Sequence, residues 1–492
     1  MATGAPQAAA TERLVALTVL VVGVSLAASL AYVGGTLGVR PLDGVEGEVL
    51  YEAHRLRMGL PLYIDPVAGA LDEGPVPARF FVLYPPVWSW LVSFVPEAWA
   101  AAAGRCAGAI AWFGVLATVA STALPARRRV AWTAAAFVGG IYTLTLFGAS
   151  ARPDAVAVAL AGLGLARALR LGRVDAGCGA LFALGAWIKP NVWGIAAGAM
   201  VAGWRLDRRS ALHAVGASLG TSAVISAVLQ RASGGAWLDH LVQSTGQPMM
   251  LSVWLKSAAW RFQFQGAPLA VAVAAGWNAR GLPAVRIATY ALLASLAWAL
   301  VSLDKIGSAS NYWMEPLLAA VAVVSQAPLP ALGAKWMAPA AAAAALLQAI
   351  WTGVANVRSS IEGIEDARER AALVATARRA CGARPSDLIV ANEPGLELML
   401  NGRLLATPFQ LMHLARRGRY PLLPWIHDIE RPEVRCALMQ TDEIDRDPGI
   451  VRIDQDGFPA EVRRALRAKF KPIATRAGWT LYALRDEGAI PR

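Results

Sequence analysis

Residues 14–38 read LVALTVLVVGVSLAASLAYVGGTLG, and this stretch contains no charged side chain. At 1.5 Å per residue, a helix needs about 20 residues to cross the roughly 30 Å hydrocarbon layer of a membrane. A cleavable signal peptide has a shorter apolar core, of about 7–15 residues. The run is therefore predicted to be a retained first membrane span.

Apolar runs of the same kind continue to residue 355, and the rest of the chain is more polar. The whole sequence is 56% hydrophobic and only 16% charged, whereas a soluble domain carries about a quarter charged residues. We therefore expect a polytopic α-helical membrane domain over residues 1–355 and a soluble domain over 356–492. With the first run, the predicted spans number about eleven; the others are 104–124, 130–149, 153–171, 175–190, 191–204, 211–229, 266–279, 284–303, 311–327 and 336–355.

The charged links between the runs indicate the direction of the chain. The net charge of +12 is concentrated in short links such as 127–129 and 205–209. Basic links mark the cytoplasmic side of membrane proteins, so the excess charge is not read as a nucleic-acid site. With the N-terminus inside, an odd number of spans places residues 356–492 outside. The sequence thus predicts a multi-pass protein of the inner (plasma) membrane with an extracytoplasmic C-terminal domain. Residues 84–95, with two tryptophans, are expected to lie on the outer membrane surface.

The longest loop between spans, residues 40–103, begins with acidic side chains. Asp43 and Glu46 are three positions apart, so they would share one face of a helical turn. Carboxylates beside a membrane surface can abstract a proton or hold a divalent cation. A solvated acidic loop is an equally simple interpretation, and both remain open.

Further polar side chains stand at the outer ends of predicted spans. Arg152 and Lys189 are cations on the side where acids dominate, which makes them candidates for a phosphate ligand. The alternative is a structural ion pair with Asp154 or Asp304. A charge near hydrocarbon costs about 2.5–3.5 kcal/mol at the centre of a span, so it persists when it is paired or used. The remaining polar residues of this set flank the tenth span: Asn311, Tyr312 and Glu315.

The order of these motifs resembles a known family. The acidic motif of residues 43–48 is followed by Leu56-x-x-Gly59-x-x-Leu62-Tyr63, Tyr84-Pro85-Pro86, Arg105, Arg152-Pro153-Asp154, Lys189-Pro190 and Asn311-Tyr312-Trp313-x-Glu315-Pro316. Over about residues 10–330 the chain is similar to the C-type glycosyltransferase superfamily. That group includes protein O-mannosyltransferases, aminoarabinose transferases and the catalytic subunits of oligosaccharyltransferases.

The resemblance implies a reaction and its participants. A sugar would pass, with inversion, from a polyprenyl-phosphate donor held among membrane lipids to a glycan, lipid or protein acceptor. Many members carry adjacent acids in the first loop; here Gly44 and Val45 interrupt the pair, which leaves the base open between Glu46 and Asp43. The resemblance implies no certain cofactor, and a divalent cation at these two acids is left open. Donor phosphate is assigned to Lys189, Arg152 and Arg105, and the substrate pocket to Tyr84, Asp154, Asn311, Tyr312 and Glu315.

The C-terminal region alternates short apolar segments with helical ones, which favours a small α/β domain. Strands are expected at 387–391, 403–406, 436–439 and 479–484, and helices at 396–400 and 459–469. No glycine-rich nucleotide motif is present. Cys381 and Cys436 could form a disulfide if the domain is outside the cytoplasm. Binding of the acceptor and a purely structural role remain alternatives for this domain.

Two other classes of function were weighed. A transporter or flippase tends to show related halves and broken helices near the midplane of the membrane. No internal repeat is evident, and the polar residues cluster at the outer ends of spans, which favours interfacial chemistry. A non-catalytic envelope assembly protein is the third class; it predicts no dependence on Lys189 or on the loop acids.

Overall fold

The structure is a computed structural model, and the chain divides into two compact units. The residues that it describes are 5–245, 251–303, 310–328, 337–382, 384, 386–441, 443–444, 458–476 and 478–485. The first unit, called the helical unit below, is formed by 1–35, 105–226 and 249–363. The second, called the mixed unit, is formed by 36–104, 227–248 and 364–492.

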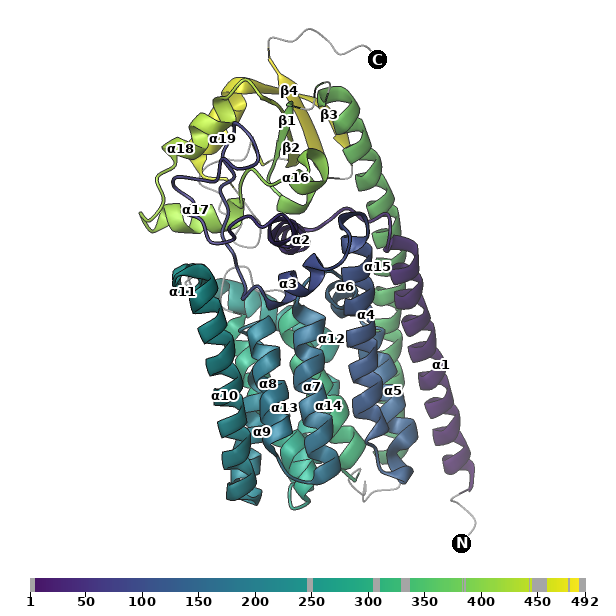
Figure 1. The fold of residues 1–492 in the computed structure, drawn as a ribbon. Coiled ribbons are helices and arrows are strands. Elements are labelled where there is room, and N and C mark those ends of the chain that lie inside the picture. The colour runs from purple at the N-terminus through teal and green to yellow at the C-terminus, as the bar shows by residue number, and fades with distance from the viewer. Residues whose placement is uncertain are drawn as a thin grey trace. The chain divides into compact units, whose positions relative to one another are not determined.

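Helices that run side by side build the helical unit (Figure 1). They are α1 (Ala5–Thr36), α4 (Glu97–Ser121), η1 (Pro125–Arg127), α5 (Arg128–Gly139), α6 (Tyr142–Gly148), α7 (Asp154–Leu171), α8 (Ala176–Ile188), α9 (Gly194–Leu206), α10 (Arg208–Ser233), α12 (Leu251–Asn278), α13 (Pro283–Ser302), η2 (Ser310–Trp313), α14 (Met314–Gln326) and the first part of α15 (Met337–Cys381).

Four helices in the described part of the chain are long and apolar enough to cross a membrane: α1 from Ala10 onward, α4, α10 and α13. A fifth is reached if the segment from η1 through α5 is joined to α6, although the two parts are bent by 77°. The expected count of about eleven is therefore not confirmed. Helices α8, α9 and α14 have 13 residues each, which gives them a length of about 20 Å.

The span expected at 130–149 is broken between α5 and α6. The break follows Gly139-Gly140, where two glycines weaken the helix. The carbonyl oxygen of Gly140 accepts hydrogen bonds from the hydroxyl groups of Ser25 and Ser29, both at 3.0 Å. Helix α1 therefore provides donors for a backbone group at the break, as an apolar environment requires.

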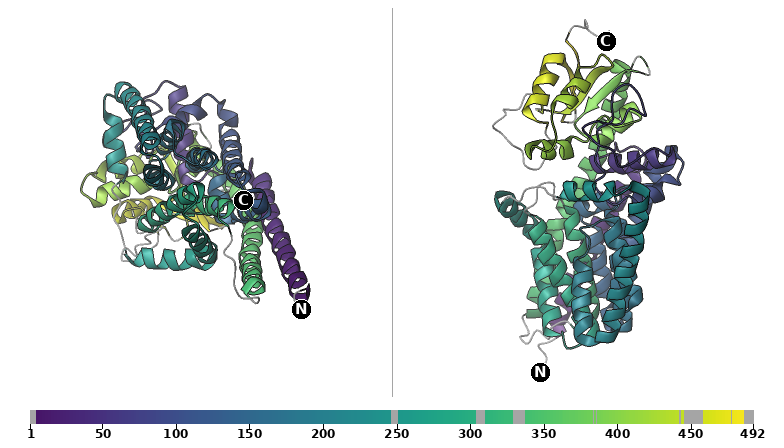
Figure 2. Two further views of the ribbon diagram at one scale, coloured as in Figure 1. Left: turned by 90° about the horizontal axis from the view of Figure 1, so that it is seen from below. Right: turned by 60° about the vertical axis from the view of Figure 1, so that its left-hand side comes forward.

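Small residues allow the helices of this unit to pack closely. A Cβ atom added at Gly198 in α9 would lie 2.1 Å from the carbonyl oxygen of Tyr290 in α13. One added at Gly179 in α8 would lie 1.9 Å from the carbonyl oxygen of Ala214 in α10. Such contacts between backbones are typical of helices that associate in membranes. Helices α1 and α15 also lie side by side (Figures 1 and 2), and Asn356 donates to the hydroxyl of Ser25 at 3.1 Å.

The mixed unit contains a four-stranded sheet with helices around it. Its strand order is β1-β2-β4-β3; β1 and β2 are parallel, and the other pairs are antiparallel. Figure 2 shows the strands in green and yellow beside the helices of the same colours. The elements of the unit are α2 (Gly44–Arg57), α3 (Val87–Ser93), α11 (Ala236–Thr245), the rest of α15, β1 (Leu388–Ala391), α16 (Pro394–Asn401), α17 (Pro408–Arg416), α18 (Leu423–Glu430), β2 (Val434–Gln440), α19 (Ala460–Lys469), β3 (Phe470–Arg476) and β4 (Trp479–Leu484).

The C-terminal α/β prediction is correct in outline and wrong in parts. The strand expected at 403–406 does not form, because the backbone N–H groups of Leu405 and Ala406 donate to the carboxylate of Glu397 instead of to a strand. Ala406 makes only an isolated bridge, with Arg79. Helices α17 and α18 and strand β3 were not expected. The helix α15 (Met337–Cys381) covers the span expected at 336–355, except for residue 336, which lies outside the described residues, and continues without a break beyond it.

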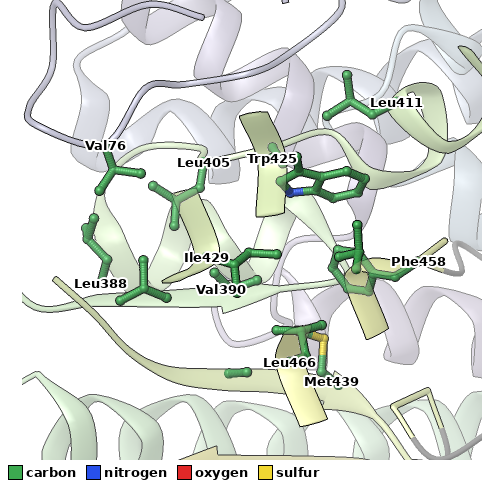
Figure 3. Close-up of a cluster of buried hydrophobic side chains, with 14 of the residues drawn as sticks. Val76, Leu388, Val390, Leu405, Leu411, Trp425, Ile429, Met439, Phe458 and Leu466 are labelled. Carbon is green, nitrogen blue, oxygen red and sulfur yellow. The ribbon is translucent and has the colours of Figure 1, made fainter. Parts of the chain in front are cut away.

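The core of the mixed unit combines the first loop with the C-terminal region. Val76 from the loop packs with Leu388 and Val390 of β1, with Trp425 of α18 and with other buried residues (Figure 3). Cys381, at the end of α15, and Cys436 in β2 form a disulfide with their Cα atoms 6.0 Å apart. The sheet is therefore tied both to the long helix and to the loop at 40–103.

Candidate active site

A buried polar cluster in the helical unit is centred on Asp154, the first residue of α7. Its Oδ1 atom accepts hydrogen bonds from the ammonium group of Lys189 and from the amide Nδ2 of Asn311, the latter at 2.5 Å. Asp154 and Lys189 are only 3% and 1% exposed at their side chains. Three elements thus bring together residues that lie 35 and 157 positions from Asp154 in sequence.

Prolines help to place the members of this cluster. Pro153 precedes the first turn of α7, where its fixed φ suits the start of a helix. Pro190 follows Lys189 and disfavours a helical conformation there, so α8 ends at Ile188 with Lys189 as its extended cap. Lys189 therefore leaves the helix at the level at which α7 begins.

A second cation completes the cluster. The Nε atom of Arg152 donates to Oδ2 of Asp154 at 3.2 Å, and its guanidinium lies 4.6 Å from the ring centroid of Phe147. Two cations and one carboxylate leave one net positive charge among Arg152, Lys189 and Asp154. Oδ1 of Asn311 is buried and has no hydrogen-bond partner within the described part of the chain. Both the predicted cations and the predicted structural pair with Asp154 are therefore present in one cluster.

Three other predicted residues belong to the helical unit: Tyr312, Glu315 and Arg105. Tyr312 shares the short helix η2 with Asn311 and is partly exposed. Glu315 is buried, and its carboxylate accepts from the backbone N–H of Ile195 at 3.0 Å, in the first turn of α9. This bond satisfies one of the unpaired donors of that helix end. Arg105 is a buried residue of α4.

The two predicted bases form a capping box in the mixed unit. Asp43 is the N-cap of α2, and its Oδ1 accepts from the backbone N–H of Glu46 at 2.8 Å, while Glu46 accepts from the N–H of Asp43 at 3.3 Å. Glu46 is fully buried and is paired with Arg40 at 3.0 Å. Asp43 is partly exposed. The spacing Asp-x-x-Glu before a helix is itself the signal for this arrangement.

Two further acids of α2 are buried within the mixed unit. Glu48 accepts from the side-chain amide of Gln410 at 2.8 Å, and Glu52 accepts from the hydroxyl of Ser89 at 2.5 Å. Burial raises the pKa of Glu52 to about 8. Tyr84, predicted to line the substrate pocket, lies just before α3 and is partly exposed. Helix α3 has seven residues, which is too short to cross a membrane.

Sequence reasoning missed a neighbour of the capping box. Glu393, the N-cap of α16, accepts from Arg370 at 2.7 Å and from the backbone N–H of Gly44. Burial raises the pKa of Glu393, and the charges of Asp43 and Glu46 raise it further. No local pattern signals this contact, because Glu393 follows a strand some 350 residues later in the chain. Among the described residues, no group of three or more His, Cys, Asp and Glu side chains is arranged to hold a metal ion.

The comparisons with known proteins show a similar fold but identify no family from the sequence. No protein-family model matches the chain, and a search of curated proteins found no match. Among solved structures, the apo form of the oligosaccharyltransferase from Archaeoglobus fulgidus is similar, with a TM-score of 0.52. The two chains are 11% identical, and the match covers 85% of this chain and 70% of that one.

This likeness shows that the chain has a fold similar to that of the Archaeoglobus fulgidus oligosaccharyltransferase. At the level of the fold, it agrees with the resemblance predicted from the order of motifs. At 11% identity it shows the fold alone, because one fold can support many activities. The narrower likeness to O-mannosyltransferases or aminoarabinose transferases stays a prediction.

Proposed function

We propose that this protein is a multi-pass membrane glycosyltransferase that transfers a sugar from a polyprenyl-phosphate donor to an extracytoplasmic acceptor. The observation that carries the proposal is the buried cluster of Arg152, Lys189 and Asp154 within a fold like that of an oligosaccharyltransferase. Charged groups this deeply buried in a helical membrane unit are expected to serve a function.

The charge of the cluster suits a phosphate group. The carboxylate of Asp154 contacts both cations, and these three groups together carry one net positive charge, which suits the negative charge of a donor phosphodiester. A guanidinium and an ammonium are the usual ligands of phosphate oxygens. The cluster would act most strongly as negative charge develops on the leaving phosphate.

We assign the base of the reaction to the first-loop carboxylates. The base takes the proton of an acceptor hydroxyl, whose oxygen attacks the anomeric carbon. The bond from that carbon to the phosphate oxygen breaks, and its electron pair leaves with the lipid phosphate. Asp43 is the better candidate for the base because it is partly exposed, whereas Glu46 is buried and paired with Arg40. Glu46 then orients Asp43 through the capping box.

The direct experiment is transfer of label. Purified protein is incubated with a panel of radiolabelled polyprenyl-phosphate sugars and with membrane-extracted acceptors, and loss of label from the lipid fraction is followed. We expect transfer from at least one donor, with release of unlabelled lipid phosphate. Movement of intact labelled lipid between leaflets without release would instead indicate a flippase, and the transferase proposal would be abandoned.

Variants then test the residue assignments. Asp43→Asn and Lys189→Met are expected to lower the transfer rate by on the order of 10²-fold, since each removes a group that acts in the transition state. Asp65→Asn is the matched control, because Asp65 is an exposed acid of the same loop, and its Oδ1 accepts from the backbone N–H of Val67 at 2.9 Å. Full activity in Asp43→Asn, in Glu46→Gln and in the double variant would remove the first-loop carboxylates from the mechanism.

A further inference from the structure

The turn that carries the two candidate bases is in direct backbone contact with the C-terminal α/β region. A Cβ atom added at Gly395, in the first turn of α16, would lie 2.3 Å from the carbonyl oxygen of Asp43 and 2.4 Å from that of Leu42. One added at Gly47 would lie 2.3 Å from the Cα atom of Gly395. Both distances are shorter than any side chain tolerates, so only glycine at these two positions permits the present contact.

A chain of polar contacts continues from this point into the sheet. Glu393 accepts from the N–H of Gly44, the first residue of α2, and from the guanidinium of Arg370. The guanidinium of Arg370 lies 5.2 Å from a ring centroid of Trp479 in β4. The backbone N–H of Leu42 also points to the sulfur atom of Met399 at 3.3 Å. The turn at 42–47 is thus held by α16, by α15 and, through Arg370, by β4.

The rest of the first loop is joined to the same region. Arg79 exchanges backbone hydrogen bonds with Leu405 and Thr407, and its guanidinium is paired with Asp428. Gln410 of α17 donates to Glu48 at 2.8 Å. The first loop and the C-terminal region are therefore joined both at α2 and at the later segment that contains Arg79.

We infer that the C-terminal α/β region is the positioning element of the catalytic turn, with Glu393 and Gly395 as its positioning residues. The catalytic role of the turn rests on the proposed function, whereas the contacts that hold the turn do not. Neither residue is assigned contact with substrate. They act through Asp43, whose carboxylate must reach the acceptor hydroxyl within hydrogen-bonding distance.

The first experiment tests whether the position of the turn affects catalysis without affecting binding of the donor. Gly395→Ala places a methyl group against the carbonyls of Leu42 and Asp43 and should move the turn. A displacement of about 1 Å at a reacting group can lower a rate by on the order of 10²-fold. We therefore expect kcat to fall by about that factor, with the KM for the donor unchanged. Gly38→Ala is the matched control, because a Cβ at Gly38 meets nothing within 4 Å; its kcat should stay within about twofold of wild type.

The second experiment uses a conservative rescue. Glu393→Ala removes the acceptor for the N–H of Gly44 and should lower kcat, whereas Glu393→Gln keeps an acceptor oxygen there and should restore most of it. Glu461→Ala, at an exposed acid of α19, is the control. Equal loss in Glu393→Ala and Glu393→Gln would overturn the positioning role, because the charge and not the contact would then be required.

Hydrogen exchange provides a reading that does not depend on activity. In Gly395→Ala and Glu393→Ala the amides of residues 42–48 should exchange faster, while those of β2 keep their protection. If wild-type protein transfers no sugar, the proposed function fails and the exchange data alone decide the inference. Unchanged exchange at 42–48 in both variants, with kcat as in wild type where activity exists, would overturn it. If Gly395→Ala loses amide protection throughout the mixed unit, the comparison of Glu393→Ala with Glu393→Gln decides the inference.

Discussion

At the scale of single residues, burial decides what each charged side chain can do. Lys189 and Asp154 are almost completely enclosed, while Arg358 and Glu362 form an ion pair with side chains 79% and 53% exposed. Water screens the exposed pair, so it contributes little. Removing one partner of a buried pair leaves an uncompensated charge, which is strongly destabilising.

Asp154→Asn should therefore destabilise the protein far more than Glu362→Gln does. We expect the free energy of unfolding to fall by about 3–5 kcal/mol for Asp154→Asn, because two cations lose their common counter-ion. For Glu362→Gln the change should be about 0.5 kcal/mol or less. Denaturant unfolding in detergent micelles measures both. Equal small losses would mean that the cluster is hydrated rather than enclosed.

The buried carboxyl group of Glu52 makes stability depend on pH. Its pKa is raised from 4.5 to about 8 by burial, so the folded protein binds this proton more tightly than the unfolded chain. The resulting stabilisation is complete below pH 4.5 and is lost as the pH rises to about 8, by about 1.4 kcal/mol per pH unit. Glu52→Gln, which cannot ionise, should raise the thermal midpoint at pH 8 and leave it unchanged at pH 4.5. A gain that is equal at both pH values would contradict this interpretation.

At the scale of elements, helix contacts depend on where glycines fall. Helices α9 and α13 approach so closely at Gly198 that a methyl group would overlap the carbonyl of Tyr290. A Cβ atom added at Gly216, in α10, would meet no other atom within 4 Å. Hydropathy treats the two glycines alike, and only the packing of the helices tells them apart.

Alanine substitutions at these two glycines should have different effects on stability. Gly198→Ala is expected to cost about 1–3 kcal/mol or more, since the helices must separate. Gly216→Ala should be neutral or should stabilise by up to about 1 kcal/mol, because alanine favours a helix. Thermal unfolding of the two purified variants, compared with wild type, provides the test. No loss of stability in Gly198→Ala would show that α9 and α13 are not in close contact.

At the scale of the whole molecule, the distribution of charge predicts which end faces the cytoplasm. The basic links predict a cytoplasmic N-terminus and an extracytoplasmic region from 356 onward. The disulfide between Cys381 and Cys436 is in keeping with that prediction, because disulfides persist in oxidising compartments.

Reporter fusions test this orientation. Alkaline phosphatase fused after residue 492 should be active, because it folds only outside the cytoplasm, and a green fluorescent protein at the same place should stay dark. The fluorescent protein fused before residue 1 should be bright. The reverse pattern would place the C-terminal region in the cytoplasm and would remove the extracytoplasmic acceptor from the proposal.

Local sequence properties were sufficient for several features of this protein. The length and hydropathy of the runs predicted helices long and apolar enough to cross a membrane, and the order of short motifs predicted a fold like that of the oligosaccharyltransferase. Strands β1, β2 and β4 also followed from local patterns. These properties are readable because each depends on residues within about 20 positions of one another.

The tertiary structure decided which residues are in contact with one another. Asp154 meets Asn311 across 157 positions, and Gly47 meets Gly395 through backbone atoms that no side-chain pattern reports. It also decided that residues 403–406 form no strand, because the carboxylate of Glu397 takes their N–H groups. Hydropathy and periodicity report whether each segment faces water or an apolar environment. Which segments contact each other depends on how they pack in three dimensions, and the local sequence does not determine that packing.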